Sequence, residues 1–199
     1  MKLYGSLTSP YVRKVRMCFK EKGIDHEFIV EGPMDGAGNV PRLNPLGKVP
    51  VLVRDDGEAL FESGMIVDYL DALSAPPLIP PDADLRWRVQ RWHALGQGIT
   101  DAVVVRLMEV RRSPERQEPA LIHRQEAKVA AAFAFAEGHI KDGEYLEGAE
   151  LTIADIAMAA ALGYVDLRYA HEWRPAYPRL ATWFKGFGRR PSFVETLPS

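Results

Sequence analysis

The chain is poor in cysteine, because Cys18 is the only one in 199 residues. A single thiol cannot form a disulfide within the chain, so a fold stapled by disulfides is excluded. The five histidines show no metal-ligand spacing, and no phosphate-binding loop, Ser-His-Asp signature or zinc motif occurs. We therefore expect no metal in the functional site.

The sequence also lacks long apolar runs and a strong excess of charge. No apolar stretch reaches the length of a membrane-spanning helix, and polar residues interrupt the N-terminal region where a signal peptide needs an apolar core. The formal net charge of −2 gives no general electrostatic reason to bind nucleic acid or a membrane. These absences favour a cytoplasmic protein. The 47% hydrophobic share suffices for a sizeable core in one or two domains.

The first thirty residues predict a strand–helix–strand unit. Lys2–Gly5 is a short strand, and Pro10 occupies a favoured first helical position with Ser9 as its N-cap. The helix is expected to end near Lys22, because Gly23 is a good residue for the left-handed position after a helix. Residues 26–30 form a second strand, and a right-handed crossover would make the two strands parallel.

The string Asn-Pro-Leu-Gly-Lys-Val-Pro-Val-Leu at residues 44–52 prepares a backbone to receive a ligand. Asn-Pro and Leu-Gly punctuate a loop, and the β-branched run at 49–53 predicts a buried strand. Pro50 stands at the start of that strand, where a lost N–H costs least. A cis bond before Pro50 would turn the N–H and C=O of Val49 outward, free to pair with an extended peptide.

A hairpin and a helix follow this strand. Asp-Asp-Gly at 55–57 predicts the turn, Ala59–Phe61 is the returning strand, and Ser63 is expected to cap a helix with apolar residues at helical spacing. A helix N-terminus attracts a carboxylate, and Glu62 beside it can hold an ammonium group. Alone, the Glu-Ser pair is only an N-cap and a first-turn acid. In the whole ordered string it predicts a site for an α-amino acid.

Beyond residue 75 the pattern changes to helices alone. A proline-rich segment, expected to be stiff and extended, separates the two halves. The glycine-rich residues 32–39 are expected to form a mobile loop near the ligand site. Helices are predicted at about 84–112, 119–140, from 152 onward, and 177–188. The expected domains are 1–75, with mixed strands and helices, a linker at 76–83, and an all-helical domain at 84–199.

The third of these helices opens with Leu-Thr-Ile-Ala-Asp at 151–155. Thr152 and Asp155 have capping-box spacing, and apolar side chains flank them at the hydrophobic-staple positions. An N-cap explanation uses every residue of the motif, so we interpret Asp155 as structural and not catalytic.

The order Ser9-Pro10, Val49-Pro50, Glu62-Ser63 and then the 151–155 motif resembles a bacterial cytosolic glutathione transferase of the serine type. The opening Gly-Ser-Leu-Thr-Ser-Pro-Tyr-Val-Arg-Lys at 5–14 is similar to the subgroup typified by the YibF protein. The resemblance implies a fold of α/β plus all-α class. An N-terminal thioredoxin-like domain that binds glutathione precedes a C-terminal helical bundle domain. It also implies a homodimer and a reaction that conjugates glutathione to a small hydrophobic electrophile.

The resemblance also implies roles for single residues. Ser9 would donate a hydrogen bond to the glutathione thiolate, with Thr8 as the alternative donor; the competing interpretation is that Ser9 only caps its helix. Val49, next to Pro50, would offer its backbone to the cysteinyl part. The γ-glutamyl group would be held by Glu62 and Ser63, and the glycyl carboxylate by Lys48.

The second substrate is harder to predict. The residues Tyr11, Val104, Leu107 and Met108 could line its pocket, yet each could equally be core. Cys18 lies in the middle of a helix and is interpreted as a packing residue, which disfavours a cysteine-type mechanism. Two alternatives stay open: a non-catalytic module that binds glutathione or a protein, and a glutathione-dependent isomerase or dehalogenase.

Overall fold

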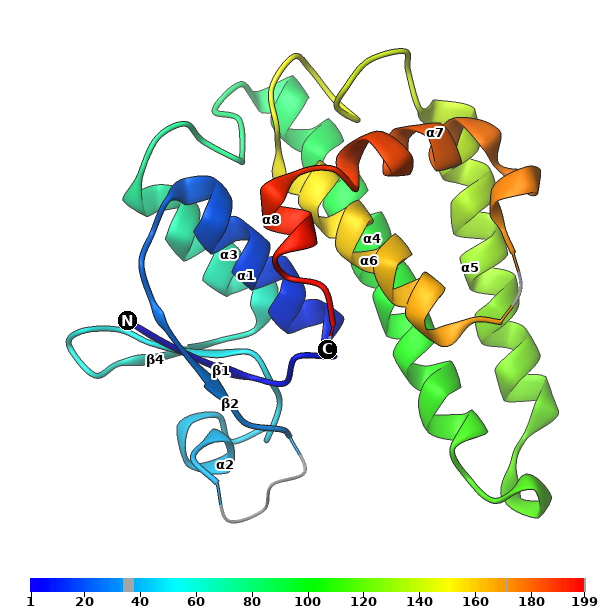
Figure 1. Cartoon of the computed structure of the whole chain (residues 1–199), viewed down its shortest axis with the longest axis horizontal. Helices are drawn as coiled ribbons and strands as arrows, with labels where there is room; N and C mark the ends of the chain where they lie inside the picture. Colours follow the sequence, from blue (N-terminus) through cyan, green and yellow to red (C-terminus); the bar gives the residue numbers. More distant parts are fainter. Residues whose placement is uncertain (34–37, 171, 199) are drawn as a thin grey trace. The chain divides into compact units, whose positions relative to one another are not determined.

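The computed structural model describes residues 1–33, 38–170 and 172–198, and it divides into two compact units (Figure 1). The first unit comprises Met1–Ile79 together with Arg190–Ser199, and the second comprises Pro80–Arg189. Of the loop predicted at 32–39, residues 34–37 lie outside the described residues.

The first unit is built on a four-stranded sheet of order β2-β1-β3-β4 (Figure 1). The strands are β1 (Lys2–Gly5), β2 (Glu27–Val30), β3 (Val51–Val53) and β4 (Ala59–Phe61). β1 and β2 are parallel, whereas β3 runs antiparallel to both of its neighbours. The register aligns Leu3, Leu52 and Leu60, which are all buried, so alternate residues of the strands face a common apolar core.

The helix α1 (Pro10–Lys22) begins and ends as its sequence predicts. The side chain of Ser9 accepts a hydrogen bond from the Val12 N–H, and Gly23 adopts a left-handed conformation with φ of 61°. Its buried face packs on α3 (Ser63–Leu73), and Figure 1 shows both helices on one side of the sheet. The helix therefore carries its own start and stop signals.

The short helix α2 (Val40–Leu43) was not predicted. Four residues are too few to show a helical period, and the helix depends on a contact from another segment. The buried carboxylate of Glu31, which follows β2, accepts hydrogen bonds from the Val40 N–H at 2.6 Å and the Asn39 side chain at 3.1 Å. Glu31 thus supplies the N-terminal acceptor that Asn39 does not.

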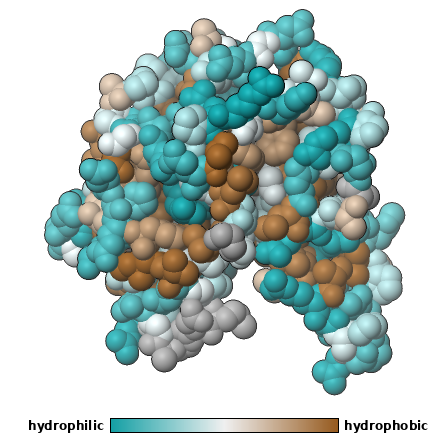
Figure 2. Space-filling view, in the orientation of Figure 1, coloured by the Kyte–Doolittle hydropathy of each residue, from teal (hydrophilic) through white to brown (hydrophobic). Residues whose placement is uncertain are grey.

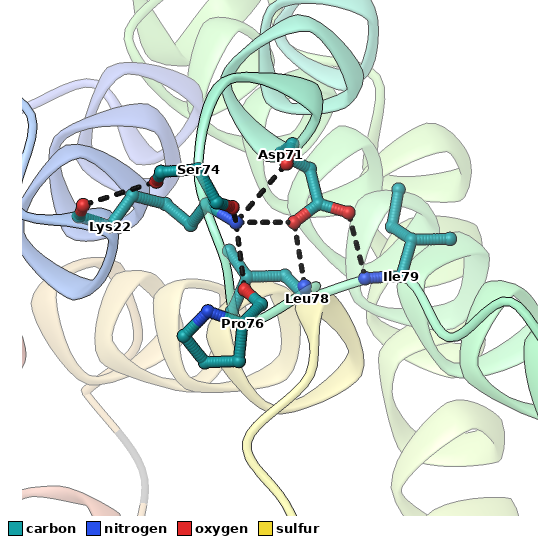
Figure 3. Close-up of polar contacts among 6 residues, drawn as sticks. All are labelled: Lys22, Asp71, Ser74, Pro76, Leu78 and Ile79. Atoms are coloured by element: carbon teal, nitrogen blue, oxygen red, sulfur yellow. Dashed lines mark hydrogen bonds and ion pairs between the residues drawn. The ribbon is translucent and has the colours of Figure 1, made fainter.

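A buried ion pair joins the C-terminal ends of α1 and α3 in the first unit (Figure 3). The ammonium of Lys22 lies 2.9 Å from a carboxylate oxygen of Asp71 and donates to the carbonyls of Ser74 and Pro76. Asp71 in turn accepts from the N–H groups of Leu78 and Ile79, at 2.6 and 3.0 Å. The first part of the proline-rich segment is therefore bound to the first unit and is not simply an extended spacer.

Among the described residues of the second unit, every regular element is a helix. Its helices are α4 (Ala83–Val110), η1 (Pro114–Arg116), α5 (Pro119–His139), α6 (Ile153–Arg168), η2 (Arg174–Ala176) and α7 (Pro178–Phe187). The predicted helices form with bounds that differ by about two residues. α6 is the buried centre, and a Cβ on Gly96 of α4 would lie 2.8 Å from the Ala157 backbone, so the two helices cross closely. Among the described residues, no helix is both long and apolar enough to cross a membrane.

The C-terminal segment Arg190–Ser199 groups with the first unit, although the sequence analysis assigned it to the helical domain. It contains the short helix α8 (Pro191–Val194), which packs on α1. Arg190 and Ser192 both bond to the carboxylate of Glu21 on α1. Single polar residues attach this segment to α1, and no periodic pattern in the sequence predicts their contacts.

Candidate functional site

The sheet register brings three predicted site segments to the same end of the strands. Tyr4, Val51 and Phe61 lie abreast on β1, β3 and β4. At this end of the strands, β1 leads to Ser9, β3 begins after Val49, and β4 leads to Glu62. Because the strands alternate in direction, segments far apart in the sequence meet at the same end of the sheet.

The two helices that follow these segments also begin at that end. Lys22 joins the last turn of α1 to the last turn of α3, and the helices pack along each other. They have similar lengths, 13 and 11 residues, so their N-termini lie together at the opposite end. Two positive helix ends thus point towards the same region, which suits an anionic ligand.

The loop before Val49 is held by Asn44, a buried residue. Its side-chain oxygen accepts from the Leu46 N–H at 3.0 Å, and its amide donates to the Lys48 carbonyl at 2.8 Å. The N–H of Gly47 donates to the Asn44 carbonyl at 2.8 Å, with φ at Gly47 of 61°. The loop conformation is therefore fixed on the protein side, and the side chain of Lys48 is exposed. Sequence reasoning used Asn44 only as loop punctuation and missed this supporting role.

Val49 is the residue that this loop presents. The Val49–Pro50 peptide bond is cis, as the sequence suggested. Pro50 and Val51 are buried, and β3 begins at Val51 and not at Val49. Neither main-chain group of Val49 bonds to another residue in the part of the chain that the structure describes. An extended peptide could therefore pair with both groups.

The prediction that Ser63 caps α3 is wrong, because the N-cap is Glu62. A carboxylate oxygen of Glu62 accepts from the Gly64 N–H at 3.0 Å and from the Ser63 hydroxyl at 2.9 Å. Among the described residues, Glu62 alone combines a side chain with positive φ, here 32°. Such a conformation is strained for a residue with a Cβ, and strain of this kind gathers at functional sites.

Ser63 is the first helical residue and is only 2% exposed. Its hydroxyl donates to Glu62, so an arriving carboxylate would either accept that hydrogen bond in place of Glu62 or accept from the N–H groups of the first turn. Either way, the exposed carboxylate of Glu62 and the positive end of α3 lie side by side. This is the arrangement of opposite charges that an α-amino acid requires.

Ser9 is the N-cap of α1, and its hydroxyl oxygen accepts from the Val12 N–H at 3.3 Å. The cap uses a lone pair of the hydroxyl and leaves its proton available. Capping and donating to a ligand are therefore compatible, which removes the conflict between the two interpretations of Ser9. Thr8 is exposed in the preceding turn, while Ser9 is half-buried.

The predicted second-substrate residues lie on separate units. Tyr11 is on α1, whereas Val104, Leu107 and Met108 share one face of α4, where Met108 is 56% exposed. The pocket that they were expected to line stays a prediction.

Two residues of chemical interest have structural roles instead, Cys18 in packing and Asp155 in helix capping. Cys18 is fully buried on α1, and burial raises the pKa of its thiol to about 12, so it is not a thiolate nucleophile at neutral pH. Burial also raises the pKa of the Asp155 carboxyl, to about 6, although Leu146 and Thr152 donate hydrogen bonds to it. Its capping box fixes the start of α6. Among the described residues, no group of three or more His, Cys, Asp or Glu could hold a metal ion.

Comparison with known families gives two matches along the chain. Residues 3–78 match the family described as glutathione S-transferase, N-terminal domain, and residues 119–186 match glutathione S-transferase, C-terminal domain. The uncharacterised GST-like protein YibF of Escherichia coli (strain K12) is 39% identical, with 100% of this chain and 98% of that protein aligned. Glutathione S-transferase 3 of Zea mays is 29% identical, at 99% and 93% coverage.

Solved structures agree with the fold. A glutathione S-transferase of Methylobacillus flagellatus KT with glutathione bound has a TM-score of 0.96 and 40% identity, covering 100% of this chain and 99% of that one. The enzyme of Methylobacterium radiotolerans, in complex with glutathione sulfonate, gives 0.93 and 36%, at 99% and 94% coverage. A family member from Pseudomonas fluorescens Pf-5 with bound glutathione gives 0.90 and 35%, at 100% and 98%. The predicted thioredoxin-like and helical architecture is confirmed.

Proposed function

Because the chain belongs to the glutathione S-transferase family, we propose that it binds glutathione, stabilises the thiolate and conjugates it to a small hydrophobic electrophile. The observation that carries the proposal is the half-buried Ser9 hydroxyl at the positive end of α1, with its proton left over by the cap. Bound glutathione in structures at least 35% identical over nearly the whole chain supports the ligand.

Binding of the peptide uses groups that the protein holds ready. The main chain of Val49 pairs with the cysteinyl residue as a short antiparallel ladder, since its N–H and C=O have no described protein partner. Glu62 receives the γ-glutamyl ammonium, and Ser63 with the first turn of α3 receives the neighbouring carboxylate. Lys48 pairs with the glycyl carboxylate from its exposed position on the loop.

Catalysis then depends on deprotonating the bound thiol. A free thiol has a pKa of about 8.5, and lowering it by two units requires about 2.7 kcal/mol of preferential stabilisation of the thiolate. The Ser9 hydroxyl donates a hydrogen bond to the sulfur, and the N-terminus of α1 adds its positive end. Ser9 does not ionise; the thiol proton leaves to solvent. The thiolate then attacks an electrophilic carbon and forms a carbon–sulfur bond. In a substitution, the leaving group departs as an anion with its bonding electron pair. In an addition to a double bond, the π electrons move onto the substrate, which takes up a proton from solvent.

Calorimetric titration with glutathione, followed by ultraviolet titration of the thiolate in the complex, tests the proposal. We expect saturable binding at one site per chain and a thiol pKa below that of free glutathione. Absence of binding would contradict the whole proposal. Binding with an unshifted thiol pKa would instead support the non-catalytic binding module.

A further inference from the structure

Arg13 is an unusual residue within α1. It lies one helical turn after Ser9, and its N–H donates to the Ser9 carbonyl at 2.9 Å. Its side chain was not singled out by the sequence, yet Arg13 is only 3% exposed. A buried guanidinium is costly unless something on the protein compensates for its lost hydration. Its contacts therefore bear on function.

Those contacts are neutral. One terminal nitrogen of Arg13 donates to the Phe193 carbonyl at 3.0 Å, and the guanidinium carbon lies 4.0 Å from the centre of the Phe193 ring. The Nε atom is buried and has no hydrogen-bond partner among the described residues. Within the same residues, no carboxylate forms an ion pair with Arg13. The positive charge is therefore shielded from water and has no carboxylate partner within residues 1–33, 38–170 and 172–198.

The charged groups around Arg13 do not compensate for it. Burial and the neighbouring Arg16 lower the pKa of Arg13 to about 10, so it stays charged at neutral pH. The acidic side chains of the elements packed on α1 serve other groups. Glu21 contacts Arg190 and Ser192, Glu195 contacts Lys20, and Asp71 contacts Lys22. Asp68 of α3 is exposed to solvent. Lys14 of α1 is a second buried cation.

We propose that Arg13 is a positioning residue whose uncompensated charge, held in place by Phe193, stabilises a thiolate bound at Ser9. Residues four apart are neighbours on a helix surface, with about 5–6 Å between their Cβ atoms. Side chains also lean towards the N-terminus of their helix, which here is the Ser9 end. A charge that lacks a counterion projects its field further than a paired one. The proposal rests on the proposed function for the identity of the thiolate.

The size of the pKa shift that Arg13 causes can be bounded. Two unit charges about 10 Å apart, at the effective dielectric of about 20 typical of protein sites, shift a pKa by roughly one unit. This effect adds to the Ser9 hydrogen bond and to the helix N-terminus. Loss of Arg13 should thus reduce the thiolate fraction about tenfold at pH values well below the thiol pKa.

A reporter thiol tests the potential at Ser9 without glutathione. In a Ser9→Cys chain, the pH dependence of alkylation gives the pKa of the introduced thiol, because buried Cys18 stays protonated and silent. Adding Arg13→Gln, whose amide can still donate to the Phe193 carbonyl, should raise that pKa by about one unit. Arg13→Lys in the Ser9→Cys chain keeps the positive charge, so the pKa of the introduced thiol should stay close to its value with Arg13. Arg16→Met, which removes a cation lying farther from Ser9 along the helix, should shift it less.

The same Arg13 substitutions in the chain that keeps Ser9 test whether the Arg13 charge affects the thiol of bound glutathione. Arg13→Gln should raise the pKa of bound glutathione by about one unit while its affinity at low pH, where the thiol is neutral, stays unchanged. An unmoved reporter pKa in a folded Arg13→Gln chain overturns the inference, as does an equal shift in Arg13→Lys, which would indicate a packing effect. If the wild type binds no glutathione, the proposed function fails, and the reporter experiment still decides the role of Arg13. Should Arg13→Gln not fold, Arg13→Met in the reporter chain replaces it.

Discussion

At the scale of single residues, the site depends on how hydroxyl and carboxylate groups divide their hydrogen bonds. Ser9 spends a lone pair on the Val12 N–H and keeps its proton. Glu62 spends one oxygen on Gly64 and Ser63 and remains exposed. Each side chain thus has a structural role at the start of its helix in addition to its proposed role in binding glutathione. Substitutions must separate these two roles before they can report on catalysis.

Ser9→Ala should raise the pKa of bound glutathione and slow conjugation about tenfold to a hundredfold, a loss of ~1–3 kcal/mol of transition-state stabilisation. It also removes an N-cap, which costs about 0.5–2 kcal/mol of stability. Ser9→Asp is the matched control, because aspartate caps helices well but repels a thiolate. It should keep the stability and still raise the thiol pKa. A shift seen only in Thr8→Ala would move the donor to Thr8.

Glu62→Gln should weaken glutathione binding by ~1.5–3 kcal/mol, measured by calorimetry, because the charge-assisted contact with the ammonium is lost. The glutamine carbonyl can still accept from Gly64 and Ser63, so the start of α3 should persist in circular dichroism. Ser63→Ala is expected to weaken binding similarly. Unchanged affinity in both variants would place the peptide site elsewhere.

At the scale of elements, α1 connects the site to the rest of the first unit. Its beginning carries Ser9, its middle carries Arg13, and its end is fixed by the Lys22–Asp71 pair (Figure 3). The ion pair and the carbonyl contacts of Lys22 join α1, α3 and residues 74–76. The alignment of the helix N-termini therefore depends on contacts at their opposite ends.

Lys22→Met should lower the free energy of unfolding by about 3–5 kcal/mol, because it leaves the Asp71 charge and several carbonyls without their buried partner. Lys20→Met is the control on the same helix, since its pair with Glu195 is exposed and should contribute at most ~1 kcal/mol. Urea unfolding of both variants measures the difference. Equal losses in the two would show that the buried pair has no special role.

His26, between α1 and β2, gives a pH dependence. Its ring stacks on Phe19 with 3.8 Å between centroids, and burial lowers the pKa of the imidazole below 6.5, opposed by a backbone contact to Ile24. A lowered histidine pKa means that its stabilising contribution is present above about pH 6.5 and is lost as the pH falls through the folded-state value. Thermal unfolding should show lower stability on the acid side, and His26→Gln should flatten this dependence. NMR titration of His26 above 6.5 would contradict the assignment.

At the scale of the whole molecule, apolar side chains remain on the surface of both units. Figure 2 shows brown patches among the hydrophilic residues of the face in view. The exposed fractions are 51% for Met65 and 47% for Leu73 on α3, and 73% for Trp87 on α4. Contiguous exposed apolar patches mark interaction surfaces, whereas single exposed apolar side chains are common. These residues are candidates for the contact surface of the homodimer that the family resemblance implies.

Sedimentation should show a homodimer at micromolar concentration, since two-fold assemblies are the commonest oligomers. Trp87→Asp should shift the equilibrium towards monomer by introducing a charge into an apolar contact. Val30→Asp, at a position 64% exposed on the edge strand β2, should leave the dimer intact. A monomeric wild type would contradict the proposal and favour the binding-module interpretation.

Local sequence by itself determined the elements with their own signals. Ser9, Pro10 and Gly23 bound α1, Thr152 and Asp155 start α6, and the Val49–Pro50 string marks the loop before β3. Capping, fixed φ and apolar periodicity act within a few residues, so they can be read from the chain. The same signals gave both halves of the fold.

Only the tertiary structure decided what depends on distant partners. Glu31 makes α2 possible, Asn44 fixes the loop before Val49, and Phe193 holds the charge of Arg13. The N-cap of α3 is Glu62 and not Ser63, and the Glu62 carboxylate accepts from the N–H of Gly64 while its backbone has a φ of 32°. Burial without a counterion is a property of the folded surroundings. No residue type or spacing in the sequence carries it, because the groups involved meet only after folding.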